Sequence, residues 1–177
     1  MQKYIKIVAF VFVAIGLIFN ISCINKDNII EERTFDDEKA ELDSMLNKLT
    51  EDGYNIDTTD MGVFYIIKNK GEEESPFPQP RDTCYIEYRL YLPSGRLIGK
   101  SHDYNTSGII IFLLGETGVP NMTPGWANGI KKMKEGSEID FFILSNLAYG
   151  KEGTANIPPF TTLIYESKMH ELHPAKD

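Results

Sequence analysis

The sequence predicts an α+β domain, in which an antiparallel sheet of about five strands wraps around one short helix and a longer helix precedes the sheet. Several segments after residue 60 alternate apolar and polar residues, as half-buried strands do, and turn-forming residues separate them. Residues 123–133 instead carry apolar side chains at helical spacing. Because antiparallel neighbours need only short connections, this order favours a sheet that curls over a single helix.

Residues 1–22 are expected to be a signal peptide. Lys3 and Lys6 form a positive start, and residues 7–19 are an apolar run too short to span a bilayer comfortably. Residues 20–23 (Asn-Ile-Ser-Cys) resemble a bacterial lipobox, which implies lipid attachment at Cys23. The alternative is an uncleaved membrane anchor. In both cases we expect the domain in the bacterial cell envelope, and the lipid-anchored form is expected at the periplasmic face of the outer membrane.

The charge of the chain excludes some partners. The formal charge is −8, and removal of residues 1–22 would take away two lysines and no acid, giving −10. An acidic chain without a basic stripe argues against nucleic acid or an anionic lipid surface as the main partner. Membrane attachment would therefore depend on acyl chains at Cys23, each buried methylene of which contributes about 0.8 kcal/mol.

Only two cysteines are present. If Cys23 carries lipid, Cys84 stands alone and no intramolecular disulfide can form. Cys84 falls in the apolar phase of a strand pattern, so a buried and inert thiol is expected.

Residues 23–34 are polar and charged and are expected to form a flexible tether. Residues 35–57 form an N-terminal helical segment, with the helix itself over 35–52, Thr34 or Asp36 as its cap and Gly53 at its end. Its apolar face is made of Phe35, Leu42, Met45, Leu46 and Leu49. We expect this face to pack on the chain's own domain, residues 58–177; the alternative is a homodimer formed through the helix.

Strand patterns follow in order. Residues 63–69 are strand-like, 71–81 form a polar loop, and 84–92 alternate cleanly before a turn at 93–95 and a return strand from 96. Residues 109–114 form a short apolar strand, 137–144 alternate again, and the last strand begins near 163. The expected inward side chains are Cys84, Ile86, Tyr88, Leu90, Leu92, Ile139, Phe141, Ile143, Leu163, Tyr165, Ser167 and Met169.

The short helix begins at Pro124, behind Thr123 as its N-cap. Trp126, Ile130 and Met133 then share one face at positions i, i+4 and i+7.

The last third of the chain carries no metal-ligand set and no nucleophile–base pair. It supplies aromatic and apolar residues, turn formers and the phenol of Tyr149. Such a site can bind an uncharged group and act on its conformation alone. His170, Glu171 and His173 have a spacing that could hold a metal, but a solvated strand end is the expectation, so neither a metal nor a cofactor is expected.

An ordered series of motifs carries a family resemblance. The segments are 123–126 (Thr-Pro-Gly-Trp), 129–130 (Gly-Ile), 133–136 (Met-Lys-Glu-Gly), 148–150 (Ala-Tyr-Gly), 157–159 (Ile-Pro-Pro) and 162–165 (Thr-Leu-Ile-Tyr). From about residue 82 to 172 the chain resembles the FKBP-type peptidyl-prolyl cis-trans isomerases. It is also loosely similar to FKBP-like lipoproteins associated with gliding motility in Bacteroidetes.

The resemblance implies site roles. Trp126 matches the floor on which a proline ring sits, Tyr149 the hydroxyl donor to a substrate carbonyl, and Tyr88 the tyrosine at the back of the pocket. Thr123 matches a backbone N–H donor, and residues 150–156 match a mobile loop over the mouth. Wall and rim positions fall on Ile98, Ile110, Phe112, Met122, Ile157 and Tyr165.

One departure concerns residues 97–101 (Leu-Ile-Gly-Lys-Ser), where the family usually has Phe-Asp-Ser-Ser. Ile98 keeps an apolar contact, but Gly99 removes a carboxylate that bonds a pocket tyrosine. A shifted loop could let Asp103 substitute; otherwise Tyr88 needs another partner. We expect weaker activity and poor binding of the family's macrolide inhibitors.

The resemblance implies a membrane-tethered isomerase that assists the folding of exported polypeptides with exposed Xaa-Pro bonds. The alternative is a catalytically weak or inactive binding module of an envelope complex.

Overall fold

The computed structural model describes residues 32–116, 118–119 and 121–176. The predicted signal peptide, the lipid site at Cys23 and most of the tether lie outside the described residues and stay predictions. Within the described part of the chain, no helix combines the length and the apolar character needed to cross a membrane. Residues from Arg33 onward form one unit, which contains every element discussed below.

The described elements, in chain order, are α2 (Phe35–Glu51), β1 (Asp57–Thr58), β2 (Phe64–Asn69), β3 (Thr83–Tyr91), β4 (Leu97–Lys100), β5 (Ile110–Leu113), α3 (Pro124–Ile130), β6 (Glu138–Ile143) and β7 (Leu163–His173). Short 3-10 turns cover Ser101–Asp103 and Ser145–Leu147. The fold class predicted from the sequence, an antiparallel sheet with two helices, is confirmed.

The sheet has seven antiparallel strands in the order β1-β2-β6-β7-β3-β4, with β5 also paired to β3. It holds more strands than the five or so expected. The difference arises because β1 is only two residues long and because two short strands share one edge of β3. The first half of β3 pairs with β5, and its second half pairs with β4.

Helix α2 begins with a capping box. The Thr34 hydroxyl accepts from the Asp37 backbone N–H at 3.2 Å, and the Asp37 carboxylate accepts from the Thr34 N–H at 2.9 Å. Gly53, at φ +91°, ends the helix as expected. Thr34, rather than Asp36, is therefore the N-cap.

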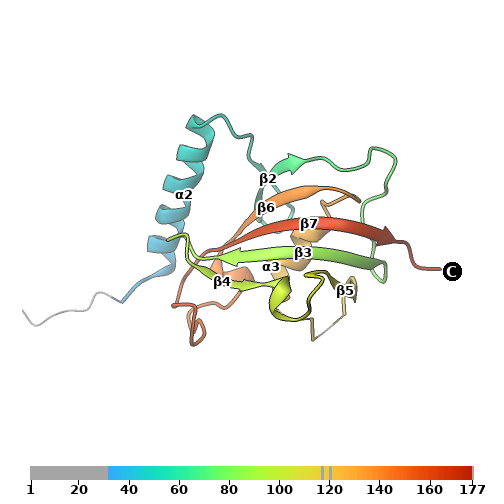
Figure 1. The fold of residues 1–177 in the computed structure, drawn as a ribbon. Coiled ribbons are helices and arrows are strands. Elements are labelled where there is room, and N and C mark those ends of the chain that lie inside the picture. The colour runs from blue at the N-terminus through green and yellow to red at the C-terminus, as the bar shows by residue number, and fades with distance from the viewer. Residues whose placement is uncertain (1–31, 117, 120, 177) are drawn as a thin grey trace, which may run out of the picture. The chain divides into compact units, whose positions relative to one another are not determined.

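The apolar face of α2 packs on its own domain, as the first of the two alternatives predicts. Leu42 and Leu46 form a second core with Ile66 and Phe142, which point outward from β2 and β6. Figure 1 shows α2 beside the strands, while α3 lies behind them. Phe142 was not expected to be buried, because Phe141 fills the inward position; the strand is covered on both faces here. The homodimer through α2 stays a prediction.

The main core lies between the sheet and α3. The inward side chains expected on β3, β6 and β7 are all buried. Gly129 brings α3 close to β6, because a Cβ there would stand 2.7 Å from the Phe141 ring. One expectation was wrong: α3 ends at Ile130, so Met133 is not on the helix, although it is buried in the core.

Candidate functional site

The centre of the candidate site is the Trp126 ring, which α3 presents to the sheet. Tyr165 of β7 stacks on it with ring centroids 4.9 Å apart and an interplanar angle of 14°. Tyr88 of β3 meets it edge-on at 4.8 Å, and Phe112 of β5 lies at 6.4 Å. The indole N–H donates to the Ser167 hydroxyl at 3.0 Å. Four elements thus converge on one aromatic cluster.

Register explains the convergence. In the β3–β7 ladder, Tyr88 pairs with Ser167 and Leu90 pairs with Tyr165, so both tyrosines face inward from neighbouring strands. The Thr123 hydroxyl caps α3 by accepting from the Trp126 N–H at 3.2 Å, and this cap fixes the start of the helix that carries the indole.

The structure brings the sequence-predicted site residues together. Tyr88, Ile110, Phe112, Trp126, Ile157 and Tyr165 belong to one buried cluster, against which Ile98, Met122 and Tyr149 pack. Thr123 is buried at the start of α3. Their common location follows from the coordinates, whereas their individual roles in binding and catalysis stay predictions.

Asn121 and Tyr104 are two residues of the site that the sequence did not predict. The Asn121 amide donates to the Tyr88 hydroxyl at 2.8 Å and to the Tyr104 hydroxyl at 3.2 Å. The Tyr165 hydroxyl in turn donates to the Asn121 backbone carbonyl at 2.8 Å. Asn121 lies in a loop without periodicity. The one indication in the sequence was Gly99, whose missing carboxylate meant that Tyr88 needs another partner.

Asp103 does not take the place of the missing carboxylate. Its oxygen accepts from the Lys100 backbone N–H at 3.1 Å and thereby closes the 3-10 turn that follows β4. The alternative in which a shifted loop carries Asp103 to Tyr88 is therefore wrong, and Asn121 is the side-chain partner of the Tyr88 hydroxyl.

The phenols of the site are kept protonated. Burial raises the pKa of Tyr88 and Tyr149 above the ordinary tyrosine value and holds the pKa of Tyr165 well above it. At neutral pH these hydroxyls are therefore uncharged hydrogen-bonding groups, and the aromatic cluster has no ionised side chain at its centre.

Trp126 and Tyr165 are fully buried, with exposed fractions of 0%. A hollow of about 360 Å³ lies along β5, and of the site residues only Ile110 and Phe112 line it, together with Asn105, Ile111, Glu116, Gly118 and Val119. A ligand in this hollow touches the wall of the cluster first. It reaches the face of Trp126 only if the covering side chains move.

The loop 150–156 is folded on itself near Tyr149. The Gly153 N–H donates to the Tyr149 carbonyl at 3.1 Å, and the Thr154 N–H donates to the Ile157 carbonyl at 2.7 Å. Arg96, in the turn between β3 and β4, donates to the Asn156 carbonyl at 2.8 Å. These bonds place the loop beside the strand turn that precedes Ile98.

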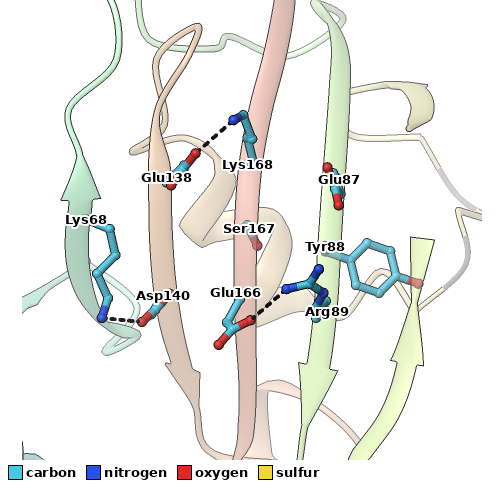
Figure 2. Close-up of a pocket in the computed structure, with 9 residues that line it drawn as sticks. All are labelled: Lys68, Glu87, Tyr88, Arg89, Glu138, Asp140, Glu166, Ser167 and Lys168. Atoms are coloured by element: carbon cyan, nitrogen blue, oxygen red, sulfur yellow. Dashed lines mark hydrogen bonds and ion pairs between the residues drawn. The ribbon is translucent and has the colours of Figure 1, made fainter. Parts of the chain in front are cut away.

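The outer face of the sheet carries a different surface. A hollow of about 350 Å³ lies on this face. Its charged side chains form three ion pairs, drawn as dashed lines in Figure 2. They are Lys68–Asp140 at 3.1 Å, Glu138–Lys168 at 2.8 Å and Arg89–Glu166 at 3.9 Å. The Tyr88 ring turns away from them, into the core. Because the charges alternate in sign and pair with one another, we interpret this face as a network of surface ion pairs in contact with solvent.

The histidines near the end of β7 pair with carboxylates. His170 lies 3.2 Å from Glu87, and His173 lies 3.1 Å from Glu171. In the described part of the chain, no three His, Cys, Asp or Glu side chains gather in a way that could hold a metal ion.

A third hollow, of about 680 Å³, lies between β2, the following loop and the end of α3. Ile67 and Phe77 are exposed there, and Tyr65 and Ile139 also line it. Its charged lining consists of Lys70, Lys131, Lys132, Lys134 and Glu73. It is a basic groove on an otherwise acidic chain.

Curated relatives share this domain. FkpA from Escherichia coli, whose name describes an FKBP-type peptidyl-prolyl cis-trans isomerase, is 31% identical over 120 residues, which are 68% of this chain and 41% of that protein. A probable FKBP-type isomerase from Haemophilus influenzae is 29% identical over 126 residues, 71% of this chain and 48% of that protein. The chain thus spans less than half the length of these relatives.

Solved structures share the fold. The crystal structure of Escherichia coli FkpA aligns with a TM-score of 0.63 and 28% identity, over 79% of this chain and 61% of that one. A peptidyl-prolyl cis-trans isomerase structure from Pseudomonas syringae also has a TM-score of 0.63, over 80% of this chain and 98% of that one; at 23% identity it supports the fold alone.

The family match covers the elements that build the aromatic cluster. It runs over residues 74–170, more than half of the chain, and includes β3 to β6, α3 and most of β7. Together with the α+β fold and the gathering of Tyr88, Trp126 and Tyr165 around one site, this match shows that the chain belongs to the FKBP-type peptidyl-prolyl cis-trans isomerase family.

Proposed function

We propose that this protein is a peptidyl-prolyl cis-trans isomerase that acts on Xaa-Pro bonds of exported polypeptides. The observation that carries the proposal is the buried aromatic cluster of Tyr88, Phe112, Trp126 and Tyr165, with Tyr149 packed against it and a hollow at its side. The cluster is apolar and uncharged and contains protonated phenols, which suits a proline ring and its flanking carbonyls, while Asn105 and Glu116 add polar groups to the hollow.

The reaction requires only rotation about the prolyl peptide bond. The barrier is about 20 kcal/mol, because the planar amide loses resonance as it twists. No proton is transferred and no covalent intermediate forms, so the protein must bind the twisted amide better than the planar one. Lowering the barrier by about 4 kcal/mol would speed the step about a thousandfold.

In this proposal the proline ring packs on Trp126 after the covering side chains move aside. A twisted amide is less dipolar than a planar one, so its carbonyl is favoured against the apolar walls formed by Ile98, Ile110 and Phe112. The Tyr149 hydroxyl and the Thr123 N–H donate to carbonyls that flank the rotating bond. Met122 and Ile157 complete the wall.

Ile98 and Gly99 set the strength of this activity. Ile98 offers a smaller and less polarisable contact than an aromatic ring, and Gly99 brings no carboxylate to the pocket. Slower isomerisation than in relatives with Phe-Asp at these positions follows, as does poor binding of macrolide inhibitors.

The test is isomerisation of a fluorogenic Xaa-Pro tetrapeptide by the full chain in detergent. Tyr149→Phe should lower kcat/KM about tenfold, the value of one hydrogen bond of about 1.4 kcal/mol. Tyr54→Phe, which removes a phenol 41% exposed and outside the site, is the matched control. A folded protein that gives no rate above the uncatalysed reaction would refute the proposal.

Membrane attachment is the second part of the proposal. Its support is the lipobox-like segment before Cys23. Expression in bacteria that are fed an alkyne-labelled fatty acid should give a labelled protein in the membrane fraction, and Cys23→Ser should abolish the label. A labelled Cys23→Ser protein would contradict lipid attachment at this residue.

A second candidate function is a binding module, and the basic groove favours it. Four lysines and one glutamate surround the exposed Ile67 and Phe77, so the groove suits an acidic polypeptide segment with apolar side chains. A fluorescent peptide of alternating Glu and Leu should bind, and Lys131→Glu with Lys132→Glu should weaken binding while leaving isomerisation unchanged. Equal binding of a Lys-Leu peptide would argue against this function.

The helix α2 homodimer is a further proposal. The side chains of Lys39, Asp43 and Asn47 are exposed on the helix and are available to a second copy. Sedimentation velocity of the full chain in detergent distinguishes a dimer from a monomer, and charge reversal at Lys39 and Asp43 should dissociate a dimer formed through this face.

A further inference from the structure

Gly99 leaves a space that a distant residue fills. Its backbone does not have a positive φ, so the conformation there does not demand glycine. It pairs with Leu90 across the β3–β4 ladder. A Cβ added to Gly99 would stand 3.2 Å from the Asn121 amide nitrogen, closer than an ordinary contact. The Asn121 side chain therefore takes up the space where a residue-99 side chain would begin.

Asn121 holds three phenols at once. Its amide donates to Tyr88 at 2.8 Å and to Tyr104 at 3.2 Å, and its backbone carbonyl accepts from Tyr165 at 2.8 Å. The residue has φ +55°, in the left-handed region that asparagine tolerates better than most residues. This turn lets side chain and carbonyl of one residue reach the same cluster.

We propose that Asn121 is the polar positioning residue of this prolyl site, which supplies from the loop before α3 the contact to Tyr88 that the strand residue Gly99 lacks. The inference rests on the proposed isomerase function. Asn121 acts through Tyr88 and Tyr165, whose rings contact Trp126 on two sides. Loss of its hydrogen bonds frees both rings to tilt.

The direction of the Tyr88 bond matters for the substrate. The Asn121 amide donates and the Tyr88 oxygen accepts, so the phenol keeps its own proton for another acceptor. A carboxylate at the same point would instead accept the hydrogen bond that this hydroxyl donates. In the proposed isomerase, Tyr88 can therefore donate to a substrate carbonyl, the role also proposed for Tyr149, once the substrate displaces the neighbouring Tyr104 hydroxyl.

The amide also keeps the site neutral over a wide range of pH. The titratable groups around it are the phenols of Tyr88, Tyr104, Tyr149 and Tyr165 and the Asp103–Lys100 pair at the edge. Asp103 accepts from the Lys100 backbone, outside the aromatic cluster. Isomerisation should thus vary little between pH 5 and pH 9, because this range lies below the ordinary tyrosine pKa of about 10 and burial raises the pKa of Tyr88 and Tyr149 further.

Three variants of the full chain test the role, each measured for kcat and KM from pH 5 to pH 9. Asn121→Gly keeps the backbone turn and removes the amide; kcat should fall about tenfold, with a smaller change in KM, at every pH. Asn121→Asp keeps the shape and adds a titrating group. Its kcat should change between pH 5 and pH 9, because the ionised carboxylate accepts a hydrogen bond from the Tyr88 hydroxyl, whereas the amide donates one to it.

The third variant moves the polar group to the strand. Gly99→Asp in the Asn121→Gly background should recover part of the lost kcat and show the same pH dependence as Asn121→Asp. Gly99→Asp alone should not gain activity, because its Cβ meets the Asn121 amide at 3.2 Å. Glu51→Gln, at an exposed position on α2, is the control, and thermal unfolding confirms that each variant is folded.

The outcomes separate the two proposals. An active protein whose Asn121→Gly variant keeps full kcat, or whose Asn121→Asp variant has a flat pH profile, overturns the positioning role and leaves the isomerase intact. An inactive but folded protein refutes the isomerase function. In that event the positioning role is judged from near-ultraviolet circular dichroism of the tyrosines: Asn121→Gly should change the spectrum, and an unchanged spectrum overturns the role.

Discussion

The carboxylate of Glu38 and the backbone of Ser145, 107 residues apart in the chain, form a hydrogen bond of 2.7 Å in the interior of the protein. Glu38 is fully buried on α2 and also accepts from the hydroxyls of Ser145 and Thr162. Ser145 opens the 3-10 turn that leads to Tyr149. The N-terminal helix is therefore fastened to the segment that carries a predicted site residue.

The first prediction is that Glu38→Gln lowers the free energy of unfolding by about 1–3 kcal/mol, because the amide nitrogen cannot accept from one of these donors and leaves it buried without a partner. Urea denaturation followed by circular dichroism measures the change. Glu51→Gln, at an exposed position of the same helix, should stay within about 0.5 kcal/mol. Equal effects of the two substitutions would show that the buried carboxylate contributes no special stability.

The second prediction concerns the bond between Trp126 and Ser167. Ser167→Ala leaves the indole N–H buried without its acceptor, so the unfolding free energy should fall by about 1–3 kcal/mol. Trp126 is the single tryptophan of the chain, so its fluorescence reports this site directly. Ser167→Ala should move the emission of the folded state to shorter wavelength. If neither the unfolding midpoint nor the fluorescence spectrum changed, the hydrogen bond from Trp126 to Ser167 would be absent in solution or another acceptor would take the place of Ser167.

The parts of the fold that have a sequence period could be predicted. In β3 the inward residues Cys84, Ile86 and Tyr88 alternate with residues of a more polar outer face. This gives the sequence a clear period of two, from which their inward orientation could be predicted. The start of α3 could be predicted because Thr123 and Pro124 are chemically suited to the first turn. The end of α3 could not, since Met133 keeps the helical spacing after the backbone has left the helix.

Contacts between separate segments could not be predicted in this way. Phe142 follows Phe141 directly, and the pattern cannot tell which of two adjacent aromatics meets a second layer. Glu38 has the composition of a solvated helix residue, and only the position of Ser145 and Thr162 accounts for its burial.

The same limit applies to the candidate site. Gly99 reveals that a side chain is missing, but only the folded chain brings Asn121 into that space. A polar residue in an irregular loop has no period to mark it.

The third prediction is that the Cys84 thiol does not react in the folded protein. It is 0% exposed, and burial raises its pKa to about 12, so the thiolate is scarce at pH 8. In a Cys23→Ser background, Ellman's reagent at pH 8 should modify Cys84 only after urea is added. Rapid modification without urea would show that the β3–β5 region opens easily.

The last prediction concerns alkaline pH. The pKa values of Tyr88, Tyr149 and Tyr165 are raised by burial in the folded state, so the unfolded chain releases these protons first. Their contribution to stability is fully present below the ordinary tyrosine pKa of about 10 and is lost as pH rises toward the folded values.

The unfolding free energy should therefore decline above about pH 10, by up to about 1.4 kcal/mol per pH unit for each such group. Urea midpoints at intervals from pH 8 to pH 11 measure the slope. Tyr165→Phe lowers stability at every pH by removing the bond to the Asn121 carbonyl, but its slope above pH 10 should be shallower because one linked proton is gone. A slope that is unchanged in this variant would show that the Tyr165 proton is not linked to folding.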